Sequence, residues 1–445
     1  MRIVIIGNGI SGITAAKTLR QLSDHEIIVI SDESELFFSR TALMYVFMGH
    51  MRVQDIVPHP KSFYEQHNIK LHFGRVNTVQ FEHKQVEFND NHTLAYDKLI
   101  IATGSKPTMY GWPGSHLDGV HNLYHLQDLE NIERHAETCK HAVIVGGGLI
   151  GIELAEMLHS RAIQVTMLVR ESGYWNNVLP AEESEILNKH ISEQGIDLQL
   201  QTELKEIWGD KEKVKMILTS NGAKINTQLV GITTGVQPNI SFLDFTSIEK
   251  NRGLLTNSFL ETSIPDVYAI GDCVELRNPT KGRKAVEPVW YTGRMMGELV
   301  AHNILGAQKA YDPGIWFNSA KFFDIEYQVY GFVPNQEMPG IKHIFWKHPS
   351  KNKSIRLVYE EKTGTILGFN LLGIRYRQEV CEKWIAEETS IETVLQNLSL
   401  ANFDPEFFKS YEKHLVHIYN EQSGAKLKLQ SNGRLSQVLT FLKHS

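Results

Sequence analysis

The chain has 445 residues, of which 42% are hydrophobic and 22% are charged, and its formal net charge is -6. A chain of this length exceeds what one hydrophobic core normally holds, so we expect two or three domains. The mild acidity argues against a nucleic-acid partner, because the chain offers no large positive field that would collect phosphates.

What the sequence lacks disfavours further classes of protein. Cys139, Cys273 and Cys381 lie far apart without a CxxC pair, which argues against a cysteine-rich metal site or a disulfide framework. No apolar run approaches the ~20 residues of a membrane span. A first strand that begins at Arg2 leaves no room for a signal peptide. We therefore expect a soluble, cytoplasmic protein with no membrane span.

The first element is a short apolar strand, Ile3–Ile6, followed by a Gly-rich turn and a helix. Gly7, Gly9 and Gly12 have G-x-G-x-x-G spacing. This spacing is typical of a dinucleotide site, where the glycines permit a tight turn, the approach of a pyrophosphate and close packing of helix on strand. We include Ser11 of the same turn among the candidate cofactor-binding residues.

The second strand, Glu26–Ser31, ends at two acidic residues, Asp32 and Glu33. An acid at this position usually accepts hydrogen bonds from a ribose diol. An ordinary acidic loop is the alternative. We interpret both residues as candidate ribose ligands and favour Glu33 over Asp32.

A second Gly-rich turn follows the strand that starts near Ala142. Gly146, Gly148 and Gly151 repeat the spacing, with Ile150 inside the turn and Glu153 on the helix. Two complete strand–turn–helix–strand units are hard to explain by chance. They predict two Rossmann-like dinucleotide-binding domains in an α/β protein.

The strand of this second unit, Val165–Val169, ends differently from that of the first. Val169 stands where an NAD-binding acid normally lies, and Arg170 follows it. An arginine there accommodates a 2′-phosphate. Glu171 is next along the chain and suits NADH instead. We lean towards NADPH, and the choice between NADH and NADPH stays open.

Two further stretches, "LIIATGSKP" at Leu99–Pro107 and "VYAIGDC" at Val267–Cys273, stand in order around the second turn. Together with both Gly-rich turns they resemble the FAD-dependent pyridine nucleotide-disulfide oxidoreductases. The closest branches are the ferredoxin and rubredoxin reductases, the NADH oxidases and the flavin part of nitrite reductases. The resemblance extends from Met1 to about Phe407.

The resemblance implies FAD and NADH or NADPH as cofactors and a split architecture. The FAD domain would comprise residues 1–108 and 240–318, and an NAD(P) domain would be inserted at 109–239. A C-terminal α+β interface domain, 319–445, would complete the fold and allow a homodimer.

The resemblance also assigns candidate cofactor-binding residues. Thr103 and Gly104 would close over the FAD pyrophosphate region. Asp272 would accept hydrogen bonds from the ribityl chain, with Gly271 permitting close approach. Arg40 would pair with an FAD phosphate.

A helix is expected from about Tyr291, following the stretch "EPVWYTG". In the family its positive N-terminus points to the flavin, and Trp290 would lie near the isoalloxazine ring. The basic stretch just before it, Lys281–Lys284, is interpreted as a solvated loop.

The sequence departs from its family near the flavin. The region "ELFFSRTALMYVFMGH" has no cysteine, so thiol–disulfide chemistry lacks its nucleophile. Tyr45 stands where the ferredoxin reductase branch has a lysine, and that lysine's partner acid matches Glu153. We treat Tyr45, Glu153 and Trp290 as candidate catalytic residues, with simple packing as the alternative for Tyr45.

In the C-terminal part, residues 316–334 and 355–373 are expected to form strands, with a hairpin turn at "EKTG", and a helix is expected at 375–387. His414 and His417 have helical spacing, but no acid or cysteine completes a site, so no metal is expected. Residues after about Lys409 go beyond what the family pattern explains, and for the mildly basic segment 426–445 a surface helix and a partner contact both stay open.

These observations predict an NAD(P)H dehydrogenase with one FAD and no second redox centre. Its partners would be NAD(P)H and a rubredoxin- or ferredoxin-like electron-carrier protein or a small-molecule acceptor. Two alternatives stay open: an oxidase that reduces oxygen, and a redox-sensing interaction protein resembling apoptosis-inducing factor.

Overall fold

The computed structural model describes residues 1–403, 407 and 409–429. The chain divides into two compact units. The first contains Met1–Val165 and Leu204–Pro313, and the second contains Thr166–Glu203 and the described residues from Gly314 onward. The three-domain division expected from the sequence stays a prediction beside this two-unit grouping.

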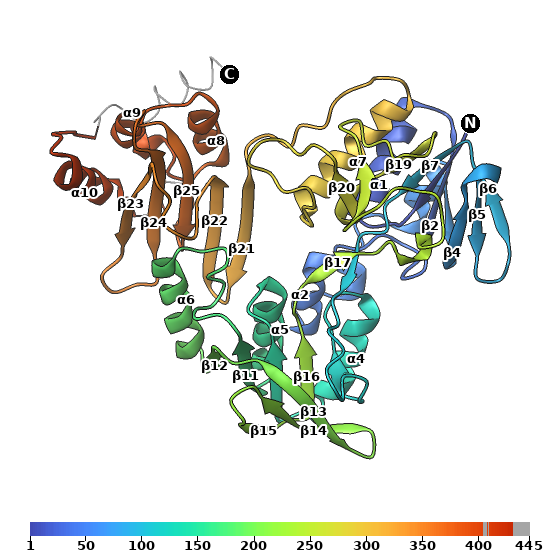
Figure 1. The fold of residues 1–445 in the computed structure, drawn as a ribbon, viewed down its shortest axis with the longest axis horizontal. Coiled ribbons are helices and arrows are strands. Elements are labelled where there is room, and N and C mark those ends of the chain that lie inside the picture. The colour runs from blue at the N-terminus through green and yellow to red at the C-terminus, as the bar shows by residue number, and fades with distance from the viewer. Residues whose placement is uncertain (404–406, 408, 430–445) are drawn as a thin grey trace. The chain divides into compact units, whose positions relative to one another are not determined.

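The first unit is built on a five-stranded parallel sheet in the order β19-β7-β1-β2-β3 (Figure 1). Its strands are β1 (Arg2–Ile6), β2 (Glu26–Ser31), β3 (Ile69–Phe73), β7 (Lys98–Ile101) and β19 (Val267–Ala269). Since β1 and β2 are almost wholly buried, they read as continuous apolar runs, which is typical of a parallel sheet covered on both faces. The first two strands predicted from the sequence, and the α/β class, are confirmed.

Two helices, α1 (Ile10–Leu22) and α7 (Trp290–Ile304), pack tightly on each other in this unit. The close approach depends on Gly297, where a Cβ atom would lie 2.4 Å from the carbonyl oxygen of Ser11. Because of this contact, residues almost 300 positions apart in the chain meet beside the first Gly-rich turn. The helix expected from about Tyr291 is confirmed and begins one residue earlier.

A second parallel set in the first unit pairs β10 (His141–Val145) with β16 (Leu229–Ile232), and β16 with β9 (Val120–His121). Helices α4 (Leu126–Ala136) and α5 (Leu149–Ser160) belong to this part. The remaining elements of the unit are α2 (Leu43–Phe47), α3 (Lys61–Gln66), β4 (Val76–Gln80), β5 (Gln85–Phe88), β6 (Thr93–Ala95), β8 (Ser105–Pro107), β13 (Leu204–Asp210), β14 (Lys213–Thr219), β15 (Lys224–Asn226), β17 (Val236–Pro238), β18 (Leu254–Thr256) and β20 (Val274–Leu276).

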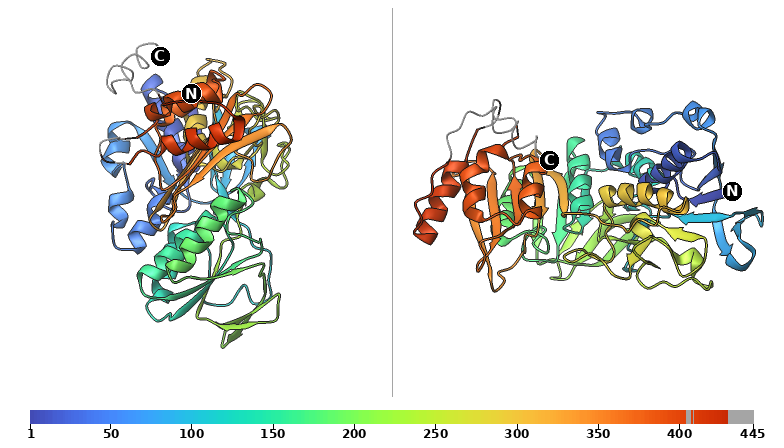
Figure 2. Two further views of the ribbon diagram at one scale, coloured as in Figure 1. Left: turned by 90° about the vertical axis from the view of Figure 1, so that its left-hand side faces the viewer. Right: turned by 90° about the horizontal axis from the view of Figure 1, so that it is seen from above.

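The second unit has a five-stranded antiparallel sheet in the order β21-β22-β25-β24-β23, coloured orange to red in Figure 2. Its strands are β21 (Phe317–Phe322), β22 (Ile325–Gly331), β23 (Ile341–Lys347), β24 (Ser354–Glu360) and β25 (Ile366–Leu372). The sheet and the helices around it share one buried core. The predicted hairpin at "EKTG" joins β24 to β25 and is confirmed.

The helices of this unit are α6 (Ala181–Glu193), α8 (Gln378–Ala386), α9 (Ile391–Asn397) and α10 (Glu412–Ser423). Strand β11 (Gln164–Val169) pairs in parallel with β12 (Asp197–Leu200). The helix expected at 375–387 is confirmed as α8. The expectation for the tail, 426–445, lies largely outside the described residues.

No helix within the described ranges is long and apolar enough to cross a membrane. The described part of the chain also contains no group of three His, Cys, Asp or Glu side chains placed to hold a metal ion.

Candidate functional site

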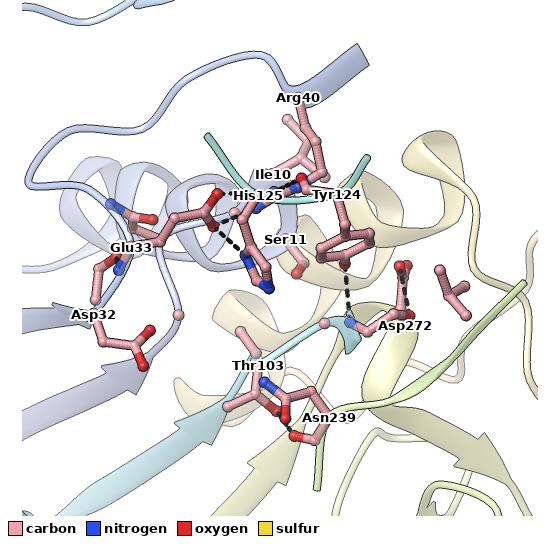
Figure 3. A pocket seen from close by; sticks show the side chains of 18 of the residues that line it. Ile10, Ser11, Asp32, Glu33, Arg40, Thr103, Tyr124, His125, Asn239 and Asp272 are labelled. Carbon is pink, nitrogen blue, oxygen red and sulfur yellow. Dashed lines mark hydrogen bonds and ion pairs between the residues drawn. The ribbon is translucent and has the colours of Figure 1, made fainter. Parts of the chain in front are cut away.

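A cavity of about 730 Å³ lies in the first unit, where the carboxyl ends of β1, β2 and β7 meet (Figure 3). The first Gly-rich turn, the start of α5 and the start of α7 all contribute to its wall. Ligands in open α/β sheets usually bind at this edge. The fold therefore brings together segments from five separate regions of the sequence around one concave site.

In the first Gly-rich turn, each of the three positions requires glycine for a different reason. Gly7 has φ +114°, and a Cβ atom there would lie 2.2 Å from the carbonyl oxygen of Ala102. A Cβ atom on Gly12 would lie 2.0 Å from the carbonyl oxygen of Gly7, so only glycine lets α1 pack this close to the turn. Gly9, by contrast, faces open space and lines the cavity, leaving the backbone accessible to an anion.

The second Gly-rich turn repeats this steric pattern. A Cβ atom would lie 2.5 Å from a backbone carbonyl oxygen at both Gly146 and Gly151, whereas Gly148 faces open space. The helix that follows, α5, reaches the cavity through Leu149, Ile150 and Glu153.

The acid favoured for ribose binding, Glu33, is fully engaged by protein groups. Its carboxylate accepts hydrogen bonds from Arg40 at 2.9 and 2.6 Å and from the backbone N–H of Leu126 at 3.0 Å, and His125 Nδ1 lies 3.5 Å away. Burial would raise the pKa of Glu33, but the bonds from His125, Arg40 and Leu126 lower it to about 2. Glu33 is therefore an ionised carboxylate holding the N-terminus of α4.

Asp32 lies at the same strand end but in a different environment. Its side chain is 58% exposed and lines the cavity. Within the described part of the chain, its carboxylate forms an ion pair only with Arg75, at 4.0 Å. Figure 3 shows Asp32 directed away from the cluster around Glu33. Of the two acids, Asp32 is the one whose carboxylate is accessible to a ligand.

Arg40 also lines the cavity, but its guanidinium is held by the protein. Besides the bidentate contact with Glu33, it donates to the carbonyl oxygen of Tyr124 and lies 4.5 Å above the centre of the Tyr124 ring. Arg40, which was predicted to pair with an FAD phosphate, thus lies at the cavity wall and is oriented by Glu33 and Tyr124.

A second polar group surrounds Asp272, which is half-buried and lies just after the carboxyl end of β19. Burial raises the pKa of Asp272, although the hydroxyl of Ser105, which donates to its carboxylate at 3.1 Å, acts in the opposite direction. Gly271 allows this arrangement, since a Cβ atom there would lie 2.6 Å from Oγ of Ser11.

Thr103 and Gly104 line the cavity between these groups. The hydroxyl of Thr103 donates to the carbonyl oxygen of Asn239 at 2.8 Å. This bond joins the turn after β7 to the residue that follows β17. The hydroxyl of Tyr124 accepts a hydrogen bond from the backbone N–H of Ser105 at 3.1 Å.

Of the three candidate catalytic residues, Glu153 and Trp290 line the cavity and Tyr45 does not. Burial, together with the neighbouring Glu156, raises the pKa of Glu153 to about 7. Tyr45 belongs to α2, where its ring stacks on His50 at 6.3 Å while its neighbour Met44 faces the cavity.

Arg170 lies in the second unit, directly after β11. Its Nε atom is 2.7 Å from Oε1 of Glu171, so the two residues that pointed to different nucleotides form an ion pair. The side chain of Arg170 is 71% exposed.

The sequence reasoning missed Ser105, Tyr124, His125 and Asn239 as residues of the cavity. Ser105 lies within the recognised stretch Leu99–Pro107, so its position was a usable signal. Tyr124, His125 and Asn239 lie in loops without a motif, and their contacts join segments from 84 to 136 residues apart.

The sequence model of the pyridine nucleotide-disulphide oxidoreductase family matches residues 1–297. The chain belongs to this family. It is accordingly an oxidoreductase that uses FAD and NAD(P)H.

Several relatives within this family are similar over most of the chain. The NADH oxidase of Methanocaldococcus jannaschii is 31% identical, covering 73% of this chain and 75% of that protein. The rubredoxin-NAD(+) reductase of Pseudomonas putida is 28% identical over 69% and 80%, respectively. The chain spans only 39% of the assimilatory nitrate reductase electron transfer subunit of Bacillus subtilis, which is 30% identical.

Among solved structures, the NAD-dependent persulfide reductase from A. fulgidus matches with a TM-score of 0.83 over 95% of this chain and 84% of that one, at 21% identity. This agreement shows a shared fold.

The family's dithiol chemistry has no counterpart in the cavity. Among the described residues that line it there is no cysteine, and all three cysteines of the chain are buried free thiols. Burial raises the pKa of Cys139 and Cys273 to about 11, so neither is a thiolate at neutral pH.

The groups around the cavity fit FAD. The open backbone at Gly9 stands at the N-terminus of α1, where a pyrophosphate is stabilised. The carboxylate of Asp272 faces the cavity and suits the hydroxyl donors of a ribityl chain. Asp32 offers an exposed carboxylate for a ribose diol.

Proposed function

We propose that this protein is an NAD(P)H dehydrogenase with a single FAD that delivers electrons to an external acceptor. The observation that carries the proposal is the shared cavity wall. The first Gly-rich turn, the helix after the second Gly-rich turn and the N-terminus of α7 border one cavity, which contains no cysteine among its described lining residues. A site that joins two dinucleotide turns without a thiol suits direct transfer between two ring systems and not disulfide reduction.

The chain's own residues would act by binding and positioning. Gly9, Asp32 and Asp272 would hold the pyrophosphate, ribose and ribityl parts of FAD, and Arg40 would face the phosphates. Bound FAD supplies the capacity to take a hydride from a nicotinamide and to release electrons singly or in pairs. The N-terminus of α7 would place a positive partial charge beside it.

Glu153 would hold or release a proton at its carboxyl group near neutral pH. The lysine of the ferredoxin reductase branch is replaced by Tyr45, which does not line the cavity. Glu153 therefore has no cation beside it to keep its carboxyl group ionised, consistent with a pKa raised to about 7. Trp290, at the start of α7, would form part of the cavity wall beside the flavin.

The second turn, Gly146–Gly151, would bind NADH or NADPH, and Arg170 would select between the two nucleotides. The three-domain division, 1–108 with 240–318, 109–239 and 319–445, belongs to this proposal. So do a homodimer and a cytoplasmic location. Three buried, unpaired thiols agree with a reducing compartment.

The acceptor would be a small electron-carrier protein or a small molecule. Support comes from the relatives whose names include rubredoxin-NAD(+) reductase. The similarity to an NADH oxidase favours oxygen as the second candidate acceptor.

Anaerobic stopped-flow mixing of the FAD-loaded protein with NADH, and separately with NADPH, tests the proposal. Rapid bleaching of the flavin with either nucleotide is the expected result. Slow bleaching with both, ending in a persistent long-wavelength band, would count against a dehydrogenase and favour the redox-sensing alternative.

Steady-state assays then separate the two acceptors. Reduction of rubredoxin or ferredoxin well above the rate of oxygen consumption supports the carrier. Fast peroxide or water formation without any carrier supports the oxidase.

A further inference from the structure

The loop after β11, residues 170–179, contains a strained aromatic residue. Trp175 has φ +56°, in the left-handed region, although its side chain is large and only 9% of the residue is exposed. A bulky residue in this region is uncommon, and its backbone is strained. Such a conformation persists only when the surrounding structure holds it in place.

The antiparallel sheet of the second unit holds one side of this loop. The Trp175 ring packs against Phe322 of β21 at 5.4 Å and Tyr327 of β22 at 5.3 Å between ring centres. The next residue is fixed as well, because the side-chain amide of Asn335 donates to the carbonyl oxygen of Asn176 at 2.9 Å.

Helix α6 holds the other side. The backbone N–H of Tyr174 donates to Oδ1 of Asn188 at 2.8 Å, and its carbonyl oxygen accepts from Ser184 Oγ at 2.7 Å. The Tyr174 side chain is wholly buried. The loop is thus held by contacts on both sides at the residues just after the Arg170–Glu171 pair.

Helix α6 is itself joined to the sheet by a buried ion pair. Arg356 of β24 donates to both oxygens of Glu183 at 2.7 and 2.8 Å, and Asn370 of β25 donates to the same carboxylate at 3.1 Å. Charges buried this deeply need pairing, and this pairing joins α6 to the sheet. Sheet, helix and loop are therefore linked to one another by buried contacts.

We infer that Trp175 is a positioning residue for nucleotide recognition: the C-terminal sheet holds the 170–176 loop, and with it Arg170, in the conformation that binds the adenosine end of NAD(P)H. The inference rests on the proposed function, in which Arg170 selects between NADH and NADPH. It gives the C-terminal part of the chain a role in nucleotide affinity, besides the interface role that the family suggests.

The test compares Trp175→Leu with Trp384→Leu in the FAD-loaded protein. Trp384 is the matched control, because it is a buried tryptophan of the same unit that stacks on Phe369, not on the loop. Isothermal titration with 2′,5′-ADP and with 5′-AMP measures binding of the adenosine end alone.

Trp175→Leu should weaken binding of 2′,5′-ADP roughly tenfold, which is the change expected when one hydrogen bond to a charged group is lost. FAD content and flavin absorbance should stay at wild-type levels, and Trp384→Leu should bind both probes as the wild type does. A folded, FAD-loaded Trp175→Leu variant with unchanged affinity for both probes would overturn the inference.

The Asn335→Ala variant and the wild type complete the test. Asn335→Ala removes the hydrogen bond to Asn176 and leaves the aromatic contacts of Trp175 in place. It should also weaken binding of 2′,5′-ADP, and it serves as the test if Trp175→Leu does not fold. Wild-type protein that binds neither probe would refute the nucleotide site itself. Wild-type binding with unchanged variants would refute only the positioning role.

Discussion

Two neighbouring acids at the end of β2 show that the surroundings of a carboxylate determine whether it pairs within the protein or is accessible to a ligand. Asp32 and Glu33 are equivalent in sequence terms, yet Glu33 is ion-paired with Arg40 and Asp32 is accessible. Removing the charge of Glu33, in a pair that is only partly exposed, leaves the guanidinium of Arg40 uncompensated, whereas the exposed charge of Asp32 contributes little.

We therefore expect Glu33→Gln to lower the free energy of unfolding by about 1–3 kcal/mol, and Asp32→Asn to change it by less than about 0.5 kcal/mol. FAD affinity should respond in the opposite order, with Asp32→Asn causing the larger loss. Denaturant unfolding and FAD titration measure the two effects. A stability loss confined to Asp32→Asn would contradict this assignment.

Glu153 provides a pH-dependent prediction. Its pKa is raised from the ordinary value of 4.5 to about 7, so the folded flavin-free protein prefers the neutral carboxyl group. The cost of ionising it is absent below pH 4.5, grows as the pH rises to about 7 and is constant above that. Glu153→Gln removes this cost.

The flavin-free Glu153→Gln variant should equal the wild type in stability near pH 4.5 and exceed it by up to about 3 kcal/mol above pH 7. Chemical denaturation across this range tests the expectation. Glu156→Gln is the control on the same helix, and it should show only part of the effect because it leaves the burial of Glu153 unchanged. A difference that is independent of pH would refute the raised pKa.

At the scale of elements, the segment before α7 departs from its sequence interpretation. The stretch Lys281–Lys284 was expected to be a solvated loop, but the Arg283 side chain is only 6% exposed and pairs with Glu287 at 2.6 Å. Glu287 immediately precedes Pro288 and Trp290 of the cavity wall. For Arg283 the expectation was wrong, because the loop folds back and buries this side chain while leaving both lysines exposed.

This pair should fix the start of α7 against the cavity. We expect Glu287→Gln to lower the free energy of unfolding by about 3 kcal/mol and to weaken FAD binding. Glu298→Gln breaks an exposed pair with Arg294 on the same helix, at the same i,i+4 spacing, and should cost less than about 1 kcal/mol. Equal effects of the two variants, measured by denaturant unfolding, would show that burial of the pair is unimportant.

At the scale of the whole molecule, the sequence pattern predicted local elements better than contacts between distant segments. Strands β1 and β2, the hairpin from β24 to β25 and the start of α7 follow from apolar runs and turn residues. The Glu33–Arg40–Leu126 contacts and the Arg356–Glu183 pair join segments up to 173 residues apart, so no local signal marks them. The Gly-rich turns were recognisable because their steric requirements restrict the residue type at each position.

The two compact units should respond differently to FAD. The residues that line the cavity all belong to the first unit, whereas the second unit has a buried core of its own. A ligand stabilises the cooperative unit that binds it, by about 2.7 kcal/mol at a hundredfold excess over its dissociation constant. We therefore expect FAD to slow amide hydrogen exchange by up to about a hundredfold in peptides from β1, α1 and β19. Exchange in β24 and β25 should change little.

Hydrogen-exchange mass spectrometry of the flavin-free and FAD-loaded protein measures this directly. Gly9→Val is the control, because a side chain at Gly9 enters the open space of the cavity and should abolish the protection without disturbing β24 or β25. Equal protection of both units by FAD would mean that they open as one cooperative body, so that the second unit senses the flavin although none of its described residues lines the cavity.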